Sequence, residues 1–470
     1  MTTKTRIDRR EFLKVGALGG VAAAAAGCAS VSTTGVTRAS GSRARSRETR
    51  NVIFMVSDGM STGTLTLADM AIRERTGRGS AWTRLWGIEG ARRAMCRTHA
   101  ADSLVTDSAA AGSAWGIGEH INNGAVNFTP DERTPTPILV QARENGLGTG
   151  LVTTTRVTHA TPASFVANIP SRDLEGGIAE QILDRGVDVV LGGGARYFPD
   201  GLLAQHPDVK VVRTGGELDR AEDDGGRLLG LFKREHMSFE LDRGEDEPHI
   251  RTMARAALDR LSSRGDGFVL QIEGGRVDHA AHANDACAII ADQIAFDEAL
   301  EEAVRFTMER DDTLLIVTTD HGNANPGLTL YKEPGNQGFA RLERARHSFD
   351  WISDQMGTGA SPEEMMGVLP MLVYQATGVE LRDSDRAWLY RHFVEHERAD
   401  GFLAASGFGP VLGAVLANSL GVAFVSPNHT ADLVEVTALG PGAERLAPTI
   451  DNIDLHELMV GTLALRPAGA

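Results

Sequence analysis

Cysteine and aromatic residues are scarce in this 470-residue chain. It contains three cysteines, and aromatic residues make up 5% of the sequence. Disulfides are therefore not the main support of the fold. The sequence leaves open whether Cys96 and Cys287 form one bridge. Hydrophobic residues still amount to 42%, which is ample for a buried core. The length fits two or three average domains, or one large α/β domain with insertions.

Positively charged residues are also fewer than negatively charged ones. The chain has 47 Lys and Arg against 63 Asp and Glu, a net charge of −16. Residues 1–27 carry five Lys or Arg and two Asp or Glu, a net of +3, so without them the charge is −19. An acidic chain of this kind repels nucleic acids and anionic membrane surfaces. We therefore expect no nucleic-acid partner.

The apolar run near the N-terminus, Val15 to Ala26, is too short and too rich in Gly and Ala for a good transmembrane helix. It follows Arg9-Arg10-Glu11-Phe12-Leu13-Lys14, which resembles a twin-arginine export signal. We therefore expect an exported protein, periplasmic or at the cell surface.

The pair Gly27-Cys28 resembles the cleavage box of bacterial lipoproteins. Cys28 would then become a lipidated N-terminus that tethers the protein to a membrane. Ala25 stands where such boxes more often carry Leu or Val, so an ordinary signal peptide stays the alternative. Residues 1–28 are thus interpreted as a signal, and residues 29–48, with Ser, Thr, Gly and scattered Arg, as a flexible tether.

From Asn51 onward, strand-like and helix-like segments alternate. The expected strands are Val52–Val56, Gly150–Thr153, Val187–Leu191, Phe268–Ile272, Leu314–Thr318 and Val422–Val425. The expected helices are Ser108–Gly116, Pro137–Asn145, Leu174–Arg185, His249–Arg264, Ala286–Met308 and Asp454–Leu463. This alternation predicts an α/β fold with a mostly parallel central sheet and helices on both faces.

Two regions interrupt the alternation. Residues 199–248 are expected to be rich in loops. Residues 324–420 form an insertion of roughly a hundred residues between two expected strands. The insertion contains two helix-like parts, Ser361–Tyr374 and Asp383–Leu403, and we expect it to form a cap-like subdomain.

Ser108 is expected at or near the first turn of a helix, because Asp107 precedes it and three alanines, strong helix formers, follow it. The backbone N–H groups of a first turn are unpaired and carry a partial positive charge. A phosphoryl group on Ser108 would therefore be stabilised there. On this stretch alone, the simpler interpretation of an Asp-Ser N-cap before a core helix stays open.

Metal-type residues follow several of the expected strands. Asp58 follows Val52–Val56, and Glu273 follows Phe268–Ile272. Asp278 and His282 are four residues apart, so on a helix they share one face and can bind one ion. Each of these patterns is common without a metal.

Two further groups complete the set. Asp320-His321-Gly322 follows the expected strand Leu314–Thr318, and His429 follows the expected strand Val422–Val425. Ligands of open α/β sheets bind beyond the carboxyl ends of the strands, where these residues would meet. Histidine-rich sets suit zinc and all-oxygen sets suit magnesium. Two close metals and a serine at a helix N-terminus are typical of in-line phosphoryl transfer.

From Asn51 to the C-terminus the chain resembles alkaline phosphatases, least clearly through residues 324–420. The motifs that carry the resemblance are Thr106–Ala111, Val152–Pro162, Ser171-Arg172, Gly192–Gly194, Glu273–His282, Thr319–Gly322 and Leu439–Glu444. The resemblance implies one catalytic domain over residues 49–470, with the insertion as its cap.

The resemblance also implies a role for each site residue. Ser108 would be the nucleophile that becomes phosphoserine, and Arg172 would clamp two phosphate oxygens. The implied metal ligands are Asp278, His282 and His429 for one zinc, Asp320 and His321 with bridging Asp58 for a second zinc, and Asp58, Thr161 and Glu273 for magnesium.

The chain departs from part of the family at three positions. His159 and His279 stand where one branch has Asp and Lys, and another branch has His at both. His159, near the substrate phosphate, could admit zinc at the third site instead of magnesium. Ser61 replaces a usual glycine, and no family role is known for His347 and Trp351, which either line the entrance or serve packing.

The implied function is an exported alkaline phosphatase that hydrolyses small-molecule phosphate monoesters through a phosphoserine intermediate. The family is often dimeric, but the insertion could either build or block a dimer interface, so a homodimer stays open. The alternatives are a phosphodiesterase or other hydrolase of the superfamily, and a catalytically inactive surface lipoprotein that binds phosphate or metal. The filled nucleophile and ligand positions favour the enzyme.

Overall fold

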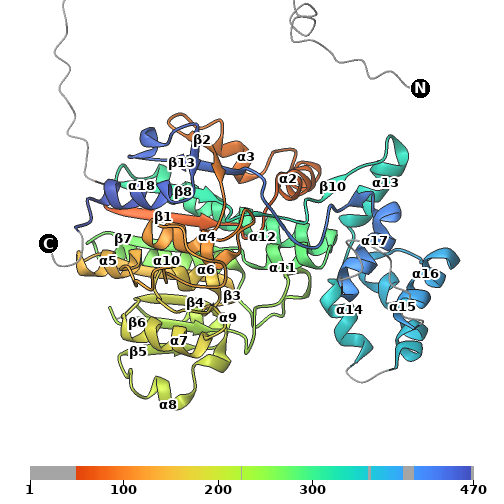
Figure 1. The fold of residues 1–470 in the computed structure, drawn as a ribbon, viewed down its shortest axis with the longest axis horizontal. Helices are drawn as coiled ribbons and strands as arrows, with labels where there is room; N and C mark the ends of the chain where they lie inside the picture. Colours follow the sequence, from red (N-terminus) through yellow and green to blue (C-terminus); the bar gives the residue numbers. More distant parts are fainter. Residues whose placement is uncertain (1–48, 224, 358–360, 395–406, 467–470) are drawn as a thin grey trace, which may run out of the picture. The chain divides into compact units, whose positions relative to one another are not determined.

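A computed structural model describes residues 49–223, 225–357, 361–394 and 407–466 (Figure 1). The expected signal over residues 1–28 and the expected tether over residues 29–48 lie outside the described residues. Among the described helices, none combines the length and the apolar composition needed to cross a bilayer.

The described strands are β1 (Asn51–Val56), β2 (Arg92–Arg97), β3 (Gly148–Arg156), β4 (Val189–Gly193), β5 (Val209–Val212), β6 (Arg227–Leu231), β7 (Phe268–Glu273), β8 (Thr313–Thr318), β9 (Gly322–Asn323), β10 (Gly327–Leu328), β11 (Val422–Ala423), β12 (His429–Thr430), β13 (Val434–Leu439) and β14 (Thr449–Asp451). Ten of these described strands form one sheet in the order β14-β2-β13-β8-β1-β7-β3-β4-β6-β5. All neighbours run parallel except β13, which is antiparallel to β2 and to β8. The predicted mostly parallel α/β sheet is confirmed.

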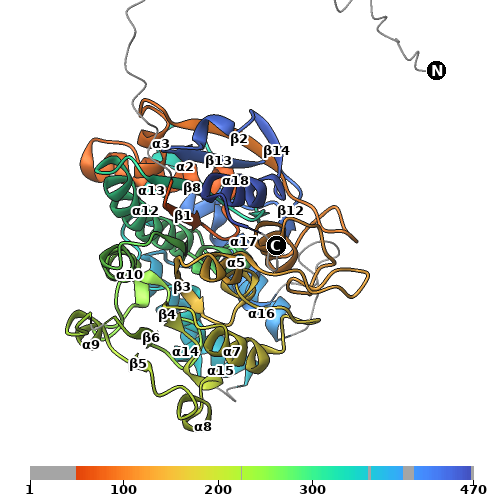
Figure 2. The same cartoon turned by 90° about the vertical axis from the view of Figure 1, so that its left-hand side faces the viewer.

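The described helices are α2 (Thr62–Thr76), α3 (Ala81–Leu85), α4 (Ser108–Ile117), α5 (Ile138–Glu144), α6 (Ala160–Ser164), α7 (Glu175–Asp184), α8 (Asp200–Leu203), α9 (Gly215–Asp219), α10 (Ile250–Ser263), α11 (Arg276–His282), α12 (Ala286–Met308), α13 (Glu333–Leu342), α14 (Phe349–Met356), α15 (Pro362–Thr377), α16 (Asp383–Phe393), α17 (Phe408–Leu420) and α18 (Asp454–Leu463). Helices α10 and α12 lie on one side of the sheet, and α5, α7 and α18 on the other (Figure 2). This covers both faces, as the alternation predicts.

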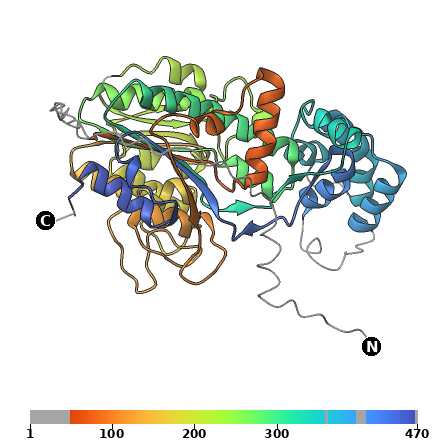
Figure 3. The same cartoon turned by 90° about the horizontal axis from the view of Figure 1, so that it is seen from above.

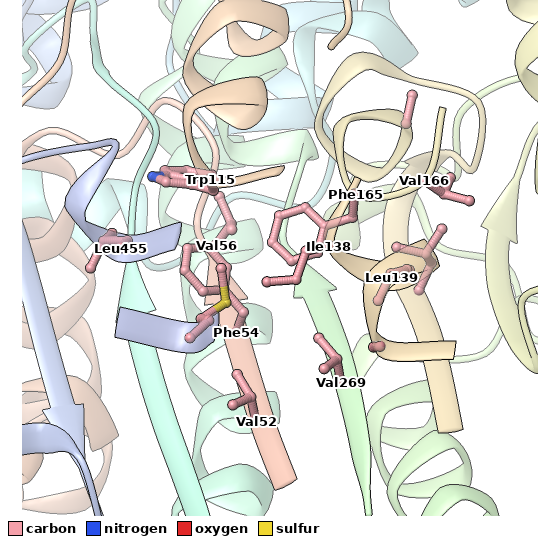
Figure 4. Packing of buried hydrophobic residues seen from close by; sticks show 14 of the residues in the cluster. Val52, Phe54, Val56, Trp115, Ile138, Leu139, Phe165, Val166, Val269 and Leu455 are labelled. Atoms are coloured by element: carbon pink, nitrogen blue, oxygen red, sulfur yellow. The ribbon is translucent and has the colours of Figure 1, made fainter. Parts of the chain in front are cut away.

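Strand β1 lies in the middle of the sheet and is buried on both faces. Val52, Phe54 and Val56 point to the face that carries α4, α5 and α18, where they pack with Trp115 and Phe165 (Figure 4). The intervening residues of β1 pack on the opposite face with α3 and α12. Burial on both faces explains why a central parallel strand is a continuous apolar run.

The predicted strand Val422–Val425 is wrong. Only Val422 and Ala423 are extended, as β11, and they pair with β10 outside the main sheet. Val425 is 65% exposed, so the apolar run does not mark a buried strand. The strand that joins the main sheet is instead β13, further along the chain, which lies between β2 and β8. Residues 199–248, expected to be loops, contain β5 and β6, which extend the sheet at its edge.

Helices α13 to α17 of the insertion gather at one end of the ribbon, beside α2 and α11 (Figure 3). Their apolar side chains form one cluster with residues of α2 and α12, such as Leu67 and Cys287. Cys96 belongs to a different cluster on the sheet, and both cysteines are free thiols. They form no disulfide.

Helix α4 packs closely on α6 because Gly116 has no side chain. A Cβ at this position would lie 2.0 Å from the backbone oxygen of Ser164. This close approach places the N-terminal residue of α4, Ser108, beside the segment that carries His159 and Thr161.

We therefore expect Gly116→Ala to lower the free energy of unfolding, opposite to the usual effect of replacing a helical glycine with alanine. Alanine in a helix is normally more stable than glycine by about 1 kcal/mol. At Gly116 the backbone clash should instead lower the free energy of unfolding by about 1–3 kcal/mol, the usual cost of overpacking. Chemical denaturation measures the change.

The matched control is Gly367→Ala in α15, where a Cβ would meet nothing within 4 Å. It should raise the free energy of unfolding by a few tenths of a kcal/mol to about 1 kcal/mol. Equal, stabilising effects of the two substitutions would contradict the close packing of α4 on α6.

Candidate functional site

Acidic residues of three neighbouring strands meet at one edge of the sheet. Glu273 is the last residue of β7, while Asp58 and Asp320 lie two residues beyond β1 and β8. Because β1 pairs in parallel with both β7 and β8, the three carboxyl ends lie side by side. All three carboxylates are fully buried. The sheet therefore concentrates negative charge at one buried point.

The first candidate metal group is Asp58, Asp320 and His321, whose ligand atoms lie within 4.8 Å of one another. His321 Nε2 is 3.0 Å from Asp320 Oδ2 and 3.8 Å from Asp58 Oδ1. Gly59 makes the turn after Asp58, with a φ of +66°, and its N–H donates to Asp320 Oδ1 at 3.0 Å. The turn thus fixes two ligands against each other.

The second group is Asp278, His282 and His429. Asp278 and His282 share one face of α11, as their spacing predicts, and His282 Nε2 is 3.3 Å from Asp278 Oδ2. His429 lies in a different structural element from the predicted one. It lies in β12, which pairs with β9 directly after His321, rather than after a strand of the main sheet.

Backbone carbonyl groups orient both histidines of the second group. Nδ1 of His282 lies 2.7 Å from the oxygen of Pro427, and Nδ1 of His429 lies 2.9 Å from the oxygen of Thr106. Since a carbonyl only accepts, each Nδ1 donates, which leaves Nε2 of each ring as the nitrogen that can bind a metal. His429 Nε2 lies 3.5 Å from Asp278 Oδ1.

The third group is Asp58, Glu273 and His159, so Asp58 belongs to two groups. Thr161 lies beside it, with its hydroxyl donating to Asp58 Oδ2 at 3.4 Å. Glu273 Oε2 accepts hydrogen bonds from the hydroxyls of two strand residues of β3, Thr153 and Thr155. The set contains mostly oxygen ligands, with one imidazole.

These carboxylates are buried close together, and a cation would relieve their mutual repulsion. Burial and the neighbouring Asp320, Asp278 and Glu273 raise the pKa of Asp58 well above its usual value. Burial likewise raises the pKa of Glu273 to about 7. Asp58 Oδ1 and Glu273 Oε1 have no hydrogen-bond partner among the described residues. Buried acids with free oxygens and mutual repulsion fit a site for divalent cations.

Around Asp278 the histidines supply the compensating charge. Burial opposes ionisation, but the neighbouring His282 and then His429 hold the pKa of Asp278 well below its usual value. Burial lowers the pKa of His282, yet Asp278 outweighs it and raises the pKa to about 9. Burial and His321 lower the pKa of His429 to about 4. A metal at this point would replace the proton on His282.

Ser108 begins α4, and Asp107 is the N-cap, accepting from the N–H of Ala110 at 2.9 Å. The Ser108 hydroxyl is therefore not used in capping. Its Oγ lies 3.4 Å from Nε2 of His321 in the first metal group. This contact places a hydroxyl, a candidate metal and a helix N-terminus together.

Arg172 pairs with Asp107, the residue before Ser108. Its Nη1 donates to Asp107 Oδ2 at 2.9 Å, and its Nη2 donates to His159 Nε2 at 3.0 Å. Burial lowers the pKa of Arg172, but the carboxylate of Asp107 outweighs this and raises it above the usual value. The charged guanidinium is thus held between Asp107 and His159.

Sequence reasoning missed some neighbours of the site. His236 lies in the loop after β6, and its ring contacts those of His159 and His279 at centroid distances of 5.4 and 4.4 Å. No pattern in the sequence singles it out, because it lies in a region expected to be loops. His347 and Trp351 belong to no metal group and stack on each other at 4.1 Å.

Comparisons with known proteins agree with this geometry. Residues 49–465 match a sequence model of the alkaline phosphatase family. The chain is 29% identical over 433 residues to alkaline phosphatase 4 of Bacillus subtilis, covering 89% of each protein. It is similar to the crystal structure of alkaline phosphatase from Thermus thermophilus, with 35% identity, a TM-score of 0.81 and coverage of 89% and 92% of the two chains. A Shewanella alkaline phosphatase aligns with a TM-score of 0.74 and 26% identity over 88% and 99% of the chains.

Metal content offers a test of the three groups. Because Asp58 belongs to two groups, Asp58→Asn should remove the ions of both and leave the ion of Asp278, His282 and His429. Plasma mass spectrometry of the purified protein measures bound ions per chain. Asp297→Asn is the control, since Asp297 is a buried acid that accepts backbone hydrogens from Ala81 and Trp82. Unchanged ion content in Asp58→Asn would contradict the assignment.

A second test uses the pH dependence of stability in the metal-free protein. The pKa of Glu273 rises from 4.5 to about 7 on folding, so the folded state binds its proton more tightly. Stability from this group is complete below pH 4.5 and is lost as the pH rises toward 7. Compared with Glu273→Gln, the wild type in chelator should thus become progressively less stable between these pH values.

Urea denaturation of both proteins at several pH values measures this difference. A stability difference that does not change between pH 4.5 and 8 would contradict the raised pKa of Glu273.

Proposed function

Since the chain belongs to the alkaline phosphatase family, we propose that it hydrolyses phosphate monoesters through a phosphoserine intermediate on Ser108. The observation that carries this proposal is the contact of Ser108 Oγ with His321, 3.4 Å away at the N-terminus of α4. A hydroxyl at a metal group and at unpaired helix N–H groups suits attack on a phosphoryl group.

The ions we propose are two zincs and one magnesium. Zinc suits the two histidine-carboxylate sets, and magnesium suits the oxygens of Asp58, Thr161 and Glu273, with zinc as the alternative there because His159 adds a nitrogen. When bound, the ions would supply Lewis-acid charge that stabilises the transferring phosphoryl group and the oxygens on either side of it.

The residues of the chain would perform two displacements. In the first, Ser108 gives up its hydroxyl proton and a bond forms between Oγ and phosphorus, while the ester oxygen leaves with the electrons of its bond and takes up a proton to become the alcohol. In the second, water loses a proton as it attacks phosphorus, and Ser108 Oγ leaves with the electrons of its bond and takes up a proton, which restores the serine and releases phosphate. Arg172 would hold two phosphate oxygens with its planar fork, oriented by Asp107.

We also propose export by the twin-arginine route, on the motif at Arg9 and Arg10, with Cys28 as a lipid tether. This route carries folded proteins and thus suits an enzyme that acquires metals before export. Small-molecule monoesters in the periplasm or at the cell surface would be the substrates.

The direct test is hydrolysis of a chromogenic aryl phosphate by protein that lacks residues 1–28. Activity should vanish on chelation and return with added zinc and magnesium. Ser108→Ala should lower kcat by roughly a thousandfold or more, because it removes the nucleophile. Steady-state kinetics in defined metal buffers measure both effects.

Ser113→Ala is the matched control, because Ser113 is a buried serine on the same helix whose hydroxyl accepts from the N–H of Asn127. It should keep wild-type kcat. Faster hydrolysis of diesters than of monoesters would indicate a phosphodiesterase instead. Phosphate binding without turnover would indicate an inactive binding protein.

A further inference from the structure

Arg276 is a buried arginine at the start of α11, the helix that carries Asp278 and His282. Its side chain is almost fully enclosed, and its guanidinium lies 3.7 Å over the ring of Phe239. Nη1 is 2.9 Å from Nδ1 of His279, and Nη2 donates to Asp350 Oδ2 at 3.0 Å.

The contact with Arg276 decides which nitrogen of His279 carries its hydrogen. A guanidinium has only donors, so Nδ1 of His279 must accept. The neutral ring therefore carries its hydrogen on Nε2. No hydrogen bond joins this Nε2 to another described residue, so its N–H is free for another group.

The ring of His279 lies beside the residues expected to bind phosphate. It contacts the ring of His159 edge-on at a centroid distance of 5.5 Å. His159 in turn accepts from Arg172, the proposed phosphate clamp. The ring of His236 lies 4.4 Å from that of His279 and 5.4 Å from that of His159, so the three imidazoles pack together and limit how far His279 can rotate.

We propose that Arg276 is a positioning residue that fixes the orientation and tautomer of His279, so that its Nε2–H donates to the substrate phosphate, directly or through one water. This inference rests on the proposed function and adds a residue outside the ligand set to it. A reversed tautomer would point a lone pair at the anionic phosphate, which repels it.

The insertion also contributes to the site, through one acidic residue. Asp350 lies in the first turn of α14, within the insertion, and holds the second edge of the Arg276 guanidinium. The other acids facing Arg276 are Asp292 of α12 and Asp242. Asp350 is 60% exposed, so its ion pair contributes orientation more than energy.

The test measures the dissociation constant of inorganic phosphate by calorimetry, on protein loaded with zinc and magnesium. Arg276→Met keeps the bulk over Phe239 but removes the donor, and should weaken phosphate binding about five- to tenfold. Arg276→Lys keeps a donor for His279 and should restore affinity to within about twofold of wild type.

A double-mutant cycle separates positioning from packing. If Arg276 acts through His279, Arg276→Met should have no further effect on phosphate binding in a His279→Ala background. Arg93→Met is the matched control, because Arg93 stacks over Trp86 at 3.7 Å and pairs with Glu435 away from the metal groups. It should leave the affinity unchanged.

Wild-type affinity in Arg276→Met, or an equal loss in the His279→Ala background, would overturn the inference. If Arg276→Met does not fold, Asp350→Ala decides instead. It should weaken phosphate binding about twofold in the wild type and not at all in His279→Ala.

If the loaded wild type turns over aryl phosphate, the proposed function stands whatever the cycle gives. If it neither binds phosphate nor turns over, the proposed function fails, and the inference with it.

Discussion

The site depends on one constraint, the burial of several carboxylates where three parallel strands end. Asp58, Glu273 and Asp320 come together because β1 pairs with β7 on one side and β8 on the other. Their mutual repulsion without solvent is unfavourable unless cations enter. The surrounding structure brings the remaining groups to this point: α11 supplies Asp278 and His282, and the pairing of β12 with β9 supplies His429. Belonging to the alkaline phosphatase family agrees with this arrangement.

The same constraint places the proposed chemistry. A metal group that includes His321 contacts the hydroxyl of Ser108, and α4, which begins at Ser108, packs closely on α6, which begins directly after His159. Among the described residues of the insertion, Asp350 reaches the site indirectly, through its ion pair with Arg276. The sheet and the helices packed on it thus set the positions of the proposed reacting groups, and the insertion contributes Asp350, which orients Arg276.

Much of this could be predicted from the sequence because its signals are local. Apolar runs identify the central strands, and the spacing of Asp278 and His282 identifies a helix face. The helix N-terminus at Ser108 follows from Asp107 and three alanines. The family resemblance supplied His159, Thr161 and Arg172, which no local pattern assigns to the site.

The rest depends on long-range packing. The run at residues 422–425 resembles a strand, but insertion helices bury only its first residue, and β13 enters the sheet antiparallel instead. His429 reaches the site by a two-residue pairing that no periodicity marks. The contacts of His236 with His159 and His279, and that of Arg276 with Asp350, join segments far apart in the chain, and a sequence without an alignment cannot pair them.

The central claim is that Ser108 carries the phosphoryl group. The most direct test is to mix the metal-loaded protein with a phosphate monoester, quench with acid, and map phosphorylation by mass spectrometry of its peptides. The account predicts a phosphoryl group on Ser108 in the wild type and none in Ser108→Ala. Turnover with no phosphorylated peptide at any time, or with phosphate on another residue, would contradict it.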